Sequence, residues 1–489
     1  MTTNEVTPKR YSLLINGEWR EASSGETSTR LNPADQSPVA VLPMATEGEL
    51  DAAVAAARAA FDAGAWSGSV AQRAAVLRTA GAKIRAEAQD LAQLLVREVG
   101  KPLGEAMIEI FMIASICDAY ASMAENLHGR VVGNASPTAL GLIMKEPVGV
   151  VAAITPWNWP LLLLLRKVGG ALAAGCTMVA RPSILTGAST YEIARIFTEA
   201  GAPPGVLNVV TGAANLIGEK LVQHPGVDKV CFTGSTAVGK HIMELASHDA
   251  KRVSLELGGK SPNIVFADAN LEAAVGGAVI ACYLNCGQTC SAGTRLLLER
   301  GIHDSFMEML VGGIRGMKVG DPMEAGTNIG PLVSEEQLRT VQSYVDIGIR
   351  EGAKLVLGGK RLTDPPYDKG FFFEPTVFDE VRNDMRIARE EIFGPVLTVT
   401  TFDDADQAMS IANDNIYGLA AGIWSSDLGK CMRFIRGLKA GSVYVNCYYD
   451  CGVPNLPFGG YKQSGIGREE GIEGLELFLE TKSVHMNHG

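Results

Sequence analysis

The sequence predicts an α/β fold with open, doubly wound parallel sheets. Short runs rich in β-branched residues alternate with helical segments, first between residues 149 and 258 and again from Asn263 onward. Alternation of this kind is typical of parallel strands joined by crossover helices. At 489 residues the chain exceeds what one hydrophobic core usually supports, so we expect two or three domains. Ligands on such sheets bind at the carboxyl ends of the strands.

The N-terminal part of the chain is expected to be a helical scaffold. Residues 49–100 are rich in alanine, and their apolar residues recur at intervals of three and four until a glycine. That spacing is typical of amphipathic helices that end at a glycine. A further helix is predicted from Glu105 to about Asn126.

Two sets of strands follow this scaffold. The first set has the sequences GVVAAIT, TMVARP, VLNVV, KVCFTG and RVSLELG, separated by helical segments with a glycine stop or an N-terminal cap. The second set has NIVFAD, RLLLER, KLVLGG, GPVLTVTTF and GSVYVNCY. We place a domain boundary between the sets, near residues 258–260. The C-terminal GLELFLETKSVHMNHG is expected to form an edge strand that pairs with a partner subunit.

Composition and charge disfavour several classes of function. The formal net charge is −11, from 43 basic and 54 acidic side chains, without a basic run that could follow nucleic-acid phosphates. The N-terminus has no apolar signal region, and the longest bare apolar run, Leu161–Leu165, is far short of the ~20 residues that span a bilayer. We expect a cytoplasmic protein with no nucleic-acid or membrane partner. Its nine cysteines are expected to be reduced thiols rather than a disulfide framework.

The stretch CYLNCGQTCSAGTR, residues 282–295, places three cysteines at intervals of four. On one face of a helix they could bind zinc, but the spacing lacks the usual C-x2-C pairs, so no metal is expected. Cys282 and Cys286 are expected inside the helix as buried, inert packing. Cys290 lies in a loop of small residues that closes the helix, where a thiol near backbone N–H groups can be a nucleophile. Packing is the alternative for Cys290 as well.

Two further side chains suit the chemistry of a nucleophilic thiol. Glu256 ends an apolar strand in SLELGGK, where a hydrophobic surrounding should raise the carboxyl pKa and favour a general base. The alternative is an ordinary carboxylate paired with Lys260. Asn158 in TPWNWP follows a strand, and its amide could donate to an oxyanion together with the N–H of Cys290. A turn asparagine with a local role is the alternative.

The stretch FTGSTAVG, residues 232–239, is a candidate phosphate site. It follows a predicted strand and opens a helix, where N–H groups and the helix dipole attract anions. It lacks the G-x-G-x-x-G dinucleotide fingerprint, so an ordinary capped helix start is the alternative.

Six motifs occur in order: TPWNWP, FTGS, LELGGK, GQTC, EEIFGPV and PFGGYKQSGIGRE. Together they make the chain resemble the NAD(P)-dependent aldehyde dehydrogenase superfamily, of the non-acylating, hydrolytic type, over nearly its whole length. The resemblance implies a Rossmann-like cofactor domain, an α/β catalytic domain and a small oligomerisation β-extension in a homodimer or homotetramer. The implied ranges are 1–123 and 147–258 for the NAD(P)-binding domain, 259–470 for the catalytic domain, and 124–146 and 471–489 for the oligomerisation segments.

The resemblance also implies roles for individual residues. Cys290 matches the family's nucleophile, Glu256 its general base and Asn158 its oxyanion donor. The thiolate would attack the aldehyde, hydride transfer to the nicotinamide would leave a thioester, and water activated by Glu256 would release the acid. The positions implied around the dinucleotide are Ile154, Trp157, Arg181, Ser183, Ile184, Phe232, Gly234, Ser235, Val238, Leu257, Glu391 and Phe393.

The cofactor is expected to be NAD, with NADP as the alternative. Where family members commonly have Lys-Pro-Ser-Glu, this chain has Arg-Pro-Ser-Ile, residues 181–184. Ile184 removes an acid that would repel the 2′-phosphate of NADP, and Arg181 could pair with that phosphate. If Arg181 only replaces the contact of the lysine, NAD remains preferred.

The substrate is expected to be a semialdehyde, or an aromatic or aliphatic aldehyde with a polar end. Arg166 lies eight residues after Asn158, on the helix face that lines the substrate tunnel in the family. An arginine there is similar to semialdehyde and hydroxyaldehyde dehydrogenases, because it can pair with a substrate carboxylate. A structural salt bridge is the alternative for Arg166. The other expected tunnel residues are Trp159, Leu162, Leu284, Tyr448, Tyr449 and Phe458.

Three rival functions were weighed against hydrolytic aldehyde oxidation. In a CoA-acylating aldehyde dehydrogenase CoA would take the acyl group from Cys290, but Glu256 in an intact ELGGK argues against it. A cysteine hydrolase or acyltransferase would need a histidine partner for the thiol, and none of the seven histidines lies in such a motif. A catalytically silent scaffold is disfavoured because Cys290, Glu256 and Asn158 are all present.

Overall fold

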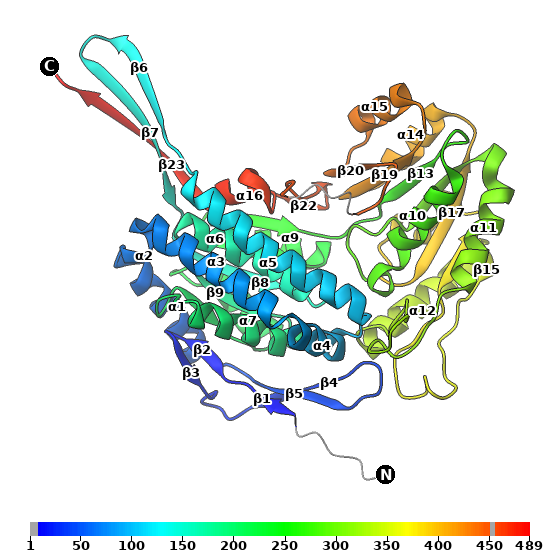
Figure 1. The fold of residues 1–489 in the computed structure, drawn as a ribbon, viewed down its shortest axis with the longest axis horizontal. Coiled ribbons are helices and arrows are strands. Elements are labelled where there is room, and N and C mark those ends of the chain that lie inside the picture. The colour runs from blue at the N-terminus through cyan, green and yellow to red at the C-terminus, as the bar shows by residue number, and fades with distance from the viewer. Residues whose placement is uncertain (1–7, 450–454) are drawn as a thin grey trace.

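The computed structural model describes residues 8–449 and 455–489. Two large sheets, each flanked by helices, lie side by side, and a small sheet projects from the body (Figure 1). This arrangement confirms the α/β fold class that the sequence predicts. Around the first sheet lie β1 (Lys9–Arg10), β4 (Thr27–Leu31), β5 (Pro38–Pro43), α1 (Glu47–Asp62), α2 (Ala65–Gly68), α3 (Val70–Ala86), α4 (Ala88–Val99) and α5 (Leu103–Glu125).

The first sheet has eight strands in the order β22-β12-β11-β8-β9-β10-β2-β3. Its five central strands are parallel, and the chain runs from β8 outward through β9 and β10, then returns to the other side for β11 and β12. The reversal places a topological switch point between β8 and β11, where ligands bind on doubly wound sheets. The strands are β2 (Leu13–Ile15), β3 (Glu18–Arg20), β8 (Val150–Thr155), β9 (Thr177–Pro182), β10 (Leu207–Val209), β11 (Lys229–Thr233), β12 (Arg252–Glu256) and β22 (Gly465–Ile466).

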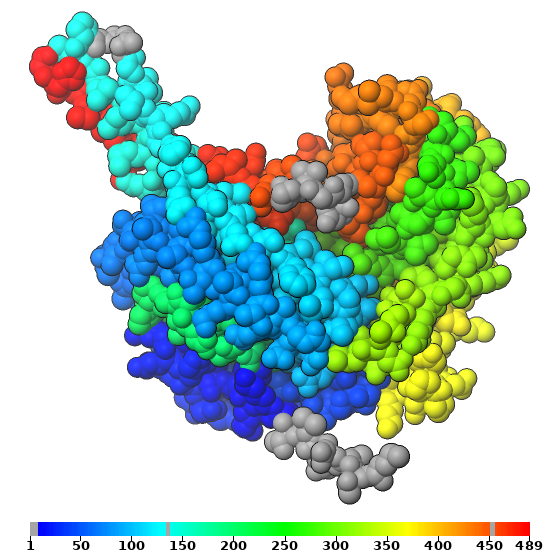
Figure 2. Space-filling view, viewed as in Figure 1, coloured from blue at the N-terminus to red at the C-terminus, as the bar shows by residue number. Residues whose placement is uncertain are grey.

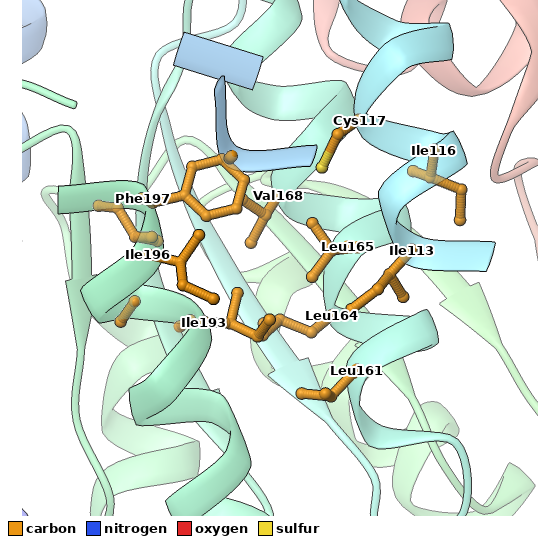
Figure 3. Packing of buried hydrophobic residues seen from close by; sticks show 14 of the residues in the cluster. Ile113, Ile116, Cys117, Leu161, Leu164, Leu165, Val168, Ile193, Ile196 and Phe197 are labelled. Atoms are coloured by element: carbon orange, nitrogen blue, oxygen red, sulfur yellow. The ribbon is translucent and has the colours of Figure 1, made fainter. Parts of the chain in front are cut away.

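Helix α6 (Pro160–Ala174) crosses between β8 and β9, and every one of its residues is buried. It packs on the sheet on one side and against α5 and α7 (Gly187–Glu199) on the other (Figure 3). A helix that is apolar all round is typical of such a central position. The side chains of this contact are Ile113, Ile116 and Cys117 of α5, Leu161, Leu164, Leu165 and Val168 of α6, and Ile193, Ile196 and Phe197 of α7.

The remaining connections of the first sheet are short helices that lead from one strand to the next. They are η1 (Ile184–Thr186), η2 (Ala214–Gly218), α8 (Glu219–Gln223) and α9 (Thr236–Ser247). Among the described helices, only α5 is long and apolar enough to cross a membrane, and half of its most apolar window is buried in the fold. That burial is typical of a core helix.

The second sheet has seven strands in the order β15-β16-β17-β14-β13-β19-β20, parallel except for the edge strand β15. Sheet membership changes between Glu256, which ends β12, and Pro262, which opens β13. The strands are β13 (Pro262–Val265), β14 (Arg295–Glu299), β15 (Lys354–Leu357), β16 (Thr376–Asp379), β17 (Val396–Phe402), β19 (Ala420–Trp424) and β20 (Ser442–Val445). The sequence analysis missed β16 and β19, because EPTVFDE and GLAAGIW lack a clear two-residue alternation.

Helices cover both faces of the second sheet, and a two-stranded ribbon lies beside it. The helices are α10 (Leu271–Tyr283), η3 (Leu284–Gly287), η4 (Arg300–Ile302), α11 (His303–Arg315), α12 (Glu335–Arg350), α13 (Arg386–Arg389), α14 (Ala405–Asn413) and α15 (Leu428–Gly437). The ribbon pairs β18 (Tyr417–Gly418) with β21 (Tyr461–Lys462).

The C-terminus ends in the edge strand that the sequence predicts. After α16 (Gly471–Glu476), β23 (Leu479–Asn487) pairs along its whole length with β7 (Ala139–Pro147), which pairs with β6 (Arg130–Ser136). The resulting three-stranded sheet stands out from the body as a narrow arm (Figure 2). Val131 and Val132 on this arm are 70% and 51% exposed.

Two glycines allow α6 to approach its neighbours closely. A Cβ atom added at Gly170 would lie 2.6 Å from the ring of Phe478, and one at Gly169 equally close to Tyr120. Gly170→Val should therefore destabilise the fold by about 1–3 kcal/mol through overpacking, seen as a lower thermal midpoint at fixed protein concentration. Gly104→Ala is the control, because nothing lies within 4 Å of its added Cβ. Equal midpoints for the two variants would contradict this account of the packing.

Candidate active site

The expected cofactor residues Ile154, Arg181 and Phe232 lie on three neighbouring strands at one sheet edge. In the strand register, Ile154 of β8 is paired with Arg181 of β9 on one side and with Phe232 of β11 on the other. All three are close to the carboxyl ends of their strands. The structure thus brings them together at the switch point of the first sheet.

The FTGS motif turns from β11 into α9. Ser235 is the N-cap of α9, where its Oγ accepts the backbone N–H of Val238 at 3.4 Å, and Gly234 N–H donates to Glu256 O at 3.0 Å. A Cβ at Gly234 would lie 2.4 Å from the Phe232 ring, so only glycine fits. The motif is therefore a capped helix start, and the N-terminus of α9 lies at the same sheet edge with Val238 47% exposed.

Several polar atoms at this edge have no partner within the protein. Thr155 Oγ1 and Arg181 Nε are buried without a hydrogen bond, and the Arg181 guanidinium donates only to Gly212 O, at 2.6 Å. Burial lowers the pKa of Arg181 to about 10. Ser183 caps η1 through the N–H of Leu185 at 3.3 Å, and Ile184 follows it half-buried. Unused buried donors of this kind fit a polar ligand such as a dinucleotide.

The ELGG loop passes between Glu391 and the backbone of Cys290. Gly259 N–H donates to Glu391 Oε1 at 3.1 Å. An added Cβ at Gly258 would lie 2.3 Å from Glu391 Oε2, and one at Gly259 would lie 2.3 Å from Cys290 O. Both positions therefore require glycine, because Glu391 and the Cys290 backbone lie too close for a side chain. The end of β12 is thus in contact with the cysteine loop.

The remaining expected cofactor residues lie around this loop. Leu257 is buried against Gly239 of α9, where an added Cβ would lie 2.4 Å from its side chain. The Trp157 and Phe393 rings meet edge to face with centroids 5.3 Å apart. Burial raises the pKa of Glu391 to about 7, opposed by the N–H of Gly259.

Glu256 is 3% exposed, and its Oε2 has no hydrogen-bond partner. Burial and the neighbouring carboxylate of Glu469 raise its pKa well above the usual range of a glutamic acid. The alternative of a pair with Lys260 is wrong, because Lys260 Nζ is likewise buried without a partner. A carboxyl group with a raised pKa and a free oxygen suits proton transfer near neutral pH.

A second buried carboxylate connects Glu256 to α6. Lys167 Nζ binds Glu469 Oε1 at 2.5 Å and Thr233 Oγ1 at 2.6 Å, and Thr233 pairs with Glu256 in the sheet. Glu469 Oε2 is buried without a partner. Lys167 and Glu469 are not among the residues that the sequence predicts for the site, although two adjacent cations in an otherwise apolar helix are an unusual signal for Lys167.

Asn158 and Trp159 are bound to the cysteine loop by side-chain hydrogen bonds. Asn158 Nδ2 donates to Gln288 O at 3.0 Å, and Trp159 Nε1 donates to Thr289 Oγ1 at 3.0 Å. Asn158 is buried, and its amide carries a second N–H. The structure therefore brings Asn158 to the loop that ends in Cys290, two residues beyond Gln288.

The expected single helix through Cys282 and Cys286 is wrong. Helix α10 ends at Tyr283, and Asn285 and Cys286 have φ angles of 54° and 55°, so the chain leaves the helical path. The turn is held because Glu105 Oε2 accepts the N–H of Asn285 at 2.8 Å. Cys282 and Cys286 are buried as expected, whereas Cys290 is partly exposed.

The chemistry of the cysteines differs with their surroundings. Burial and the carboxylates of Glu391 and Glu256 raise the pKa of Cys290 to about 12, opposed by Arg166. The resting thiol is therefore protonated, and a base must remove its proton. Within residues 8–449 and 455–489, no three His, Cys, Asp or Glu side chains are arranged to hold a metal. Cys447 is disulfide-bonded, so the expectation of reduced thiols throughout is wrong at that position.

Arg166 lies on α6, buried between an acid and an aromatic ring. Its Nη2 binds Glu470 Oε2 at 3.1 Å, and its guanidinium lies 4.4 Å from the ring centre of Phe458. Arg166 Nε is buried without a partner. The structural salt bridge is therefore present, while the Nε donor of Arg166 remains unused. The positive charge of Arg166 also lies close enough to Cys290 to act on its thiol.

The other expected tunnel residues lie on α6, at the end of α10 and in the segment that follows β20. Leu162 is buried in the first turn of α6, and Leu284 is half-buried where α10 ends. Tyr448 donates to Ser291 O at 2.9 Å. Tyr449 donates to Ala281 O at 3.0 Å. The sequence analysis missed Tyr444, whose ring lies 4.9 Å from that of Tyr448.

The sequence of this chain is similar to those of known aldehyde dehydrogenases. The aldehyde dehydrogenase family profile matches residues 19–484. A betaine aldehyde dehydrogenase of Bacillus subtilis is 43% identical over 477 residues, 97% of each chain. A peroxisomal aminoaldehyde dehydrogenase of Pisum sativum is 43% identical over 483 residues, covering 96% of this chain and 95% of the relative.

Solved structures give the same result for the fold. An NAD-dependent aldehyde dehydrogenase from Sinorhizobium meliloti superposes with a TM-score of 0.97 at 43% identity, covering 100% of this chain and 96% of the other. A Staphylococcus aureus betaine aldehyde dehydrogenase in complex with NAD+ has a TM-score of 0.96 at 39% identity, covering 98% and 95%. The chain therefore belongs to the aldehyde dehydrogenase family.

Proposed function

We propose that this chain oxidises an aldehyde to its carboxylic acid with NAD through a thioester on Cys290. The family assignment makes it an NAD-dependent aldehyde dehydrogenase. The observation that supports the hydrolytic mechanism is the position of Glu256. Its buried carboxyl group has an oxygen without a partner, and it ends the strand that leads into the loop touching the backbone of Cys290. A base held there can serve both the thiol and a hydrolytic water.

In the proposed sequence of steps, Glu256 takes the thiol proton and the Cys290 sulfur adds to the aldehyde carbon. Asn158 Nδ2 and the N–H of Cys290 donate to the resulting oxyanion. NAD, when bound at the carboxyl ends of β8, β9 and β11, would supply the hydride acceptor needed to turn this adduct into a thioester on Cys290. Glu256 then removes a proton from water as the water attacks the thioester, and the acid leaves with return of the thiol.

Lys167 favours the charged form of Glu256, whereas the carboxylate of Glu469 favours its protonated form. Lys167 Nζ is bound to Glu469 Oε1, so the two opposing charges are held together beside the base. The proton that Glu256 takes from the thiol leaves to solvent before Glu256 accepts one from water. A CoA-acylating reaction is disfavoured, because it has no use for this base.

Cys290→Ala should lower NADH formation by about 10³-fold or more, because no other described thiol lies on the loop bound by Asn158. Absorbance at 340 nm with saturating aldehyde measures the loss, and NAD binding to the variant shows that the fold persists. Cys286→Ala is the control, since that thiol is buried. Retained turnover in Cys290→Ala would show that the nucleophile is another residue.

NAD is the proposed physiological cofactor, and the end of β9 leaves NADP accessible. Arg181 is a buried cation that, among the described residues, donates only to a carbonyl oxygen, and Ile184 supplies no negative charge beside it. A 2′-phosphate would therefore meet a cation without an opposing acid.

Ile184→Glu should raise the NAD to NADP ratio of kcat/KM by about 10-fold or more, because the new carboxylate repels the 2′-phosphate. Ile184→Gln is the matched control, since it has the same size without the charge. Equal ratios in the two variants would place the 2′-position away from residue 184.

The proposed substrate carries an anionic or neutral end rather than a cationic one. The relatives include betaine aldehyde and aminoaldehyde dehydrogenases. The aldehydes in these names carry a positive charge at the end opposite the aldehyde group. In this chain, cations of the protein itself already lie over two aromatic rings of the expected tunnel. The Arg166 guanidinium lies over the ring of Phe458, and Lys101 Nζ lies 3.7 Å from the ring centre of Trp159. Resident cations disfavour a second positive charge at these rings. A semialdehyde carboxylate could instead bind the unused N–H of Arg166.

Arg166→Ala should lower kcat/KM for semialdehydes by about 10-fold to 100-fold, while neutral aldehydes change little. A panel of carboxylate-bearing, neutral and cationic aldehydes measures this selectivity. Glu470→Gln is the control, because it removes the resident partner but keeps Arg166 free to bind. If neutral aldehydes are preferred and Arg166→Ala does not alter that preference, Arg166 has only a structural role.

Assembly into a homodimer or homotetramer is proposed for the arm and the C-terminal strand. Both β23 and β6 are edges of the projecting sheet, and exposed valines lie on β6. The domain ranges given above for the NAD(P)-binding, catalytic and oligomerisation parts of the chain are proposed together with this assembly.

The cytoplasmic location stays a prediction, since relatives include enzymes described as peroxisomal and chloroplastic.

A further inference from the structure

The residues just before helix α6 supply no side-chain cap for its first backbone N–H groups. Its N-cap residue is Trp159, which makes no side-chain capping hydrogen bond, and Pro160 follows without an N–H. The missing acceptor comes from α5, where Glu109 Oε1 accepts the N–H of Leu161 at 2.9 Å and of Leu162 at 3.0 Å. A carboxylate at this position also favours the positive end of the helix dipole.

Glu109 is itself held by a buried cation. Its Oε2 is paired with Lys101 Nζ, and both side chains are completely inaccessible to solvent. The same ammonium lies over the ring of Trp159, next to Asn158. A buried ion pair of this kind is costly to break, because removal of one partner leaves a charge without compensation. The pair therefore restricts where the start of α6 can lie.

Glu105, one turn before Glu109, holds the other side of the site. Its Oε2 binds the N–H of Asn285, and Asn285 Nδ2 donates to Asn158 O at 2.8 Å. The Asn158 amide in turn donates to Gln288 O in the cysteine loop. Glu105 and Glu109 lie one turn apart on α5, and Lys101 lies just before the helix, where it pairs with Glu109.

We propose that Lys101, Glu105 and Glu109 are positioning residues that fix the Asn158 amide against the Cys290 loop. The inference rests on the proposed function, since it needs Asn158 as the oxyanion donor. Oxyanion donors act only within narrow distances of the developing charge, so a small displacement of Asn158 is costly to the rate. The start of α5 thus belongs to the catalytic apparatus, although it touches no reacting atom.

The test is a double-mutant cycle between Glu109→Gln and Asn158→Ala. Glu109→Gln should lower kcat by about 10-fold to 100-fold with little change in the KM for NAD. In the Asn158→Ala background the same substitution should lower kcat by less than about twofold, because the group that it positions is gone. Asp118→Asn, at a surface ion pair with Arg85 on the same helix, is the control and should leave kcat unchanged.

A purely structural role would lower the thermal midpoint and act equally in both backgrounds, which would overturn the inference. If Glu109→Gln does not fold because Lys101 loses its partner, Lys101→Met/Glu109→Gln removes both charges, and Glu105→Gln tests the other side. If Lys101→Met/Glu109→Gln or Glu105→Gln folds and keeps kcat within twofold of the wild type, the inference is also overturned. Activity that is lost in Asn158→Ala but kept in Glu109→Gln contradicts this inference alone. Activity kept in Asn158→Ala contradicts the proposed role of Asn158 as well.

Discussion

Two buried ion pairs and a partly buried one hold α6 in place, and the site is built around that helix. Every residue of α6 is buried, yet it carries Arg166 and Lys167, so each cation needs a compensating acid. Glu470 and Glu469 supply these acids from more than 300 residues further along the chain. Lys101 and Glu109 add a third pair at the helix start. Such pairs contribute little net stability, but they leave few alternative placements for the helix.

The reacting groups come from the two large sheets and the segments that connect their strands. Glu256 closes a strand of the first sheet, and the loop that follows it reaches the opening strand of the second within five residues. Gly258 and Gly259 let that loop pass between Glu391 and the cysteine backbone. Glu256 is held by its strand, and the segments that carry Asn158 and Cys290 are bound to each other by side-chain hydrogen bonds, which restrict the geometry of the site.

The sequence allowed the fold class and the three central residues to be predicted, since Cys290, Glu256 and Asn158 lie in local motifs at strand or helix ends. Glu109 and Glu469 could not be found in this way. A charged residue on a helix or in a loop is normally read as solvent-exposed, and only the folded chain shows that these carboxylates are buried. The kink at Cys286 was missed for the same reason, because the acceptor that supports it lies 180 residues earlier.

The short strand β22 completes the first sheet from the far end of the chain. Ile466 and Gly465 pair with Leu255 and Glu256, and Ser464 O accepts the N–H of Leu257. The surroundings of the base are therefore among the last parts of the polypeptide to be synthesised. Pairing across such a separation is slow, so the first sheet is completed beside the base late in folding. A nascent or truncated chain without β22 would contain the cysteine but would not be an active enzyme.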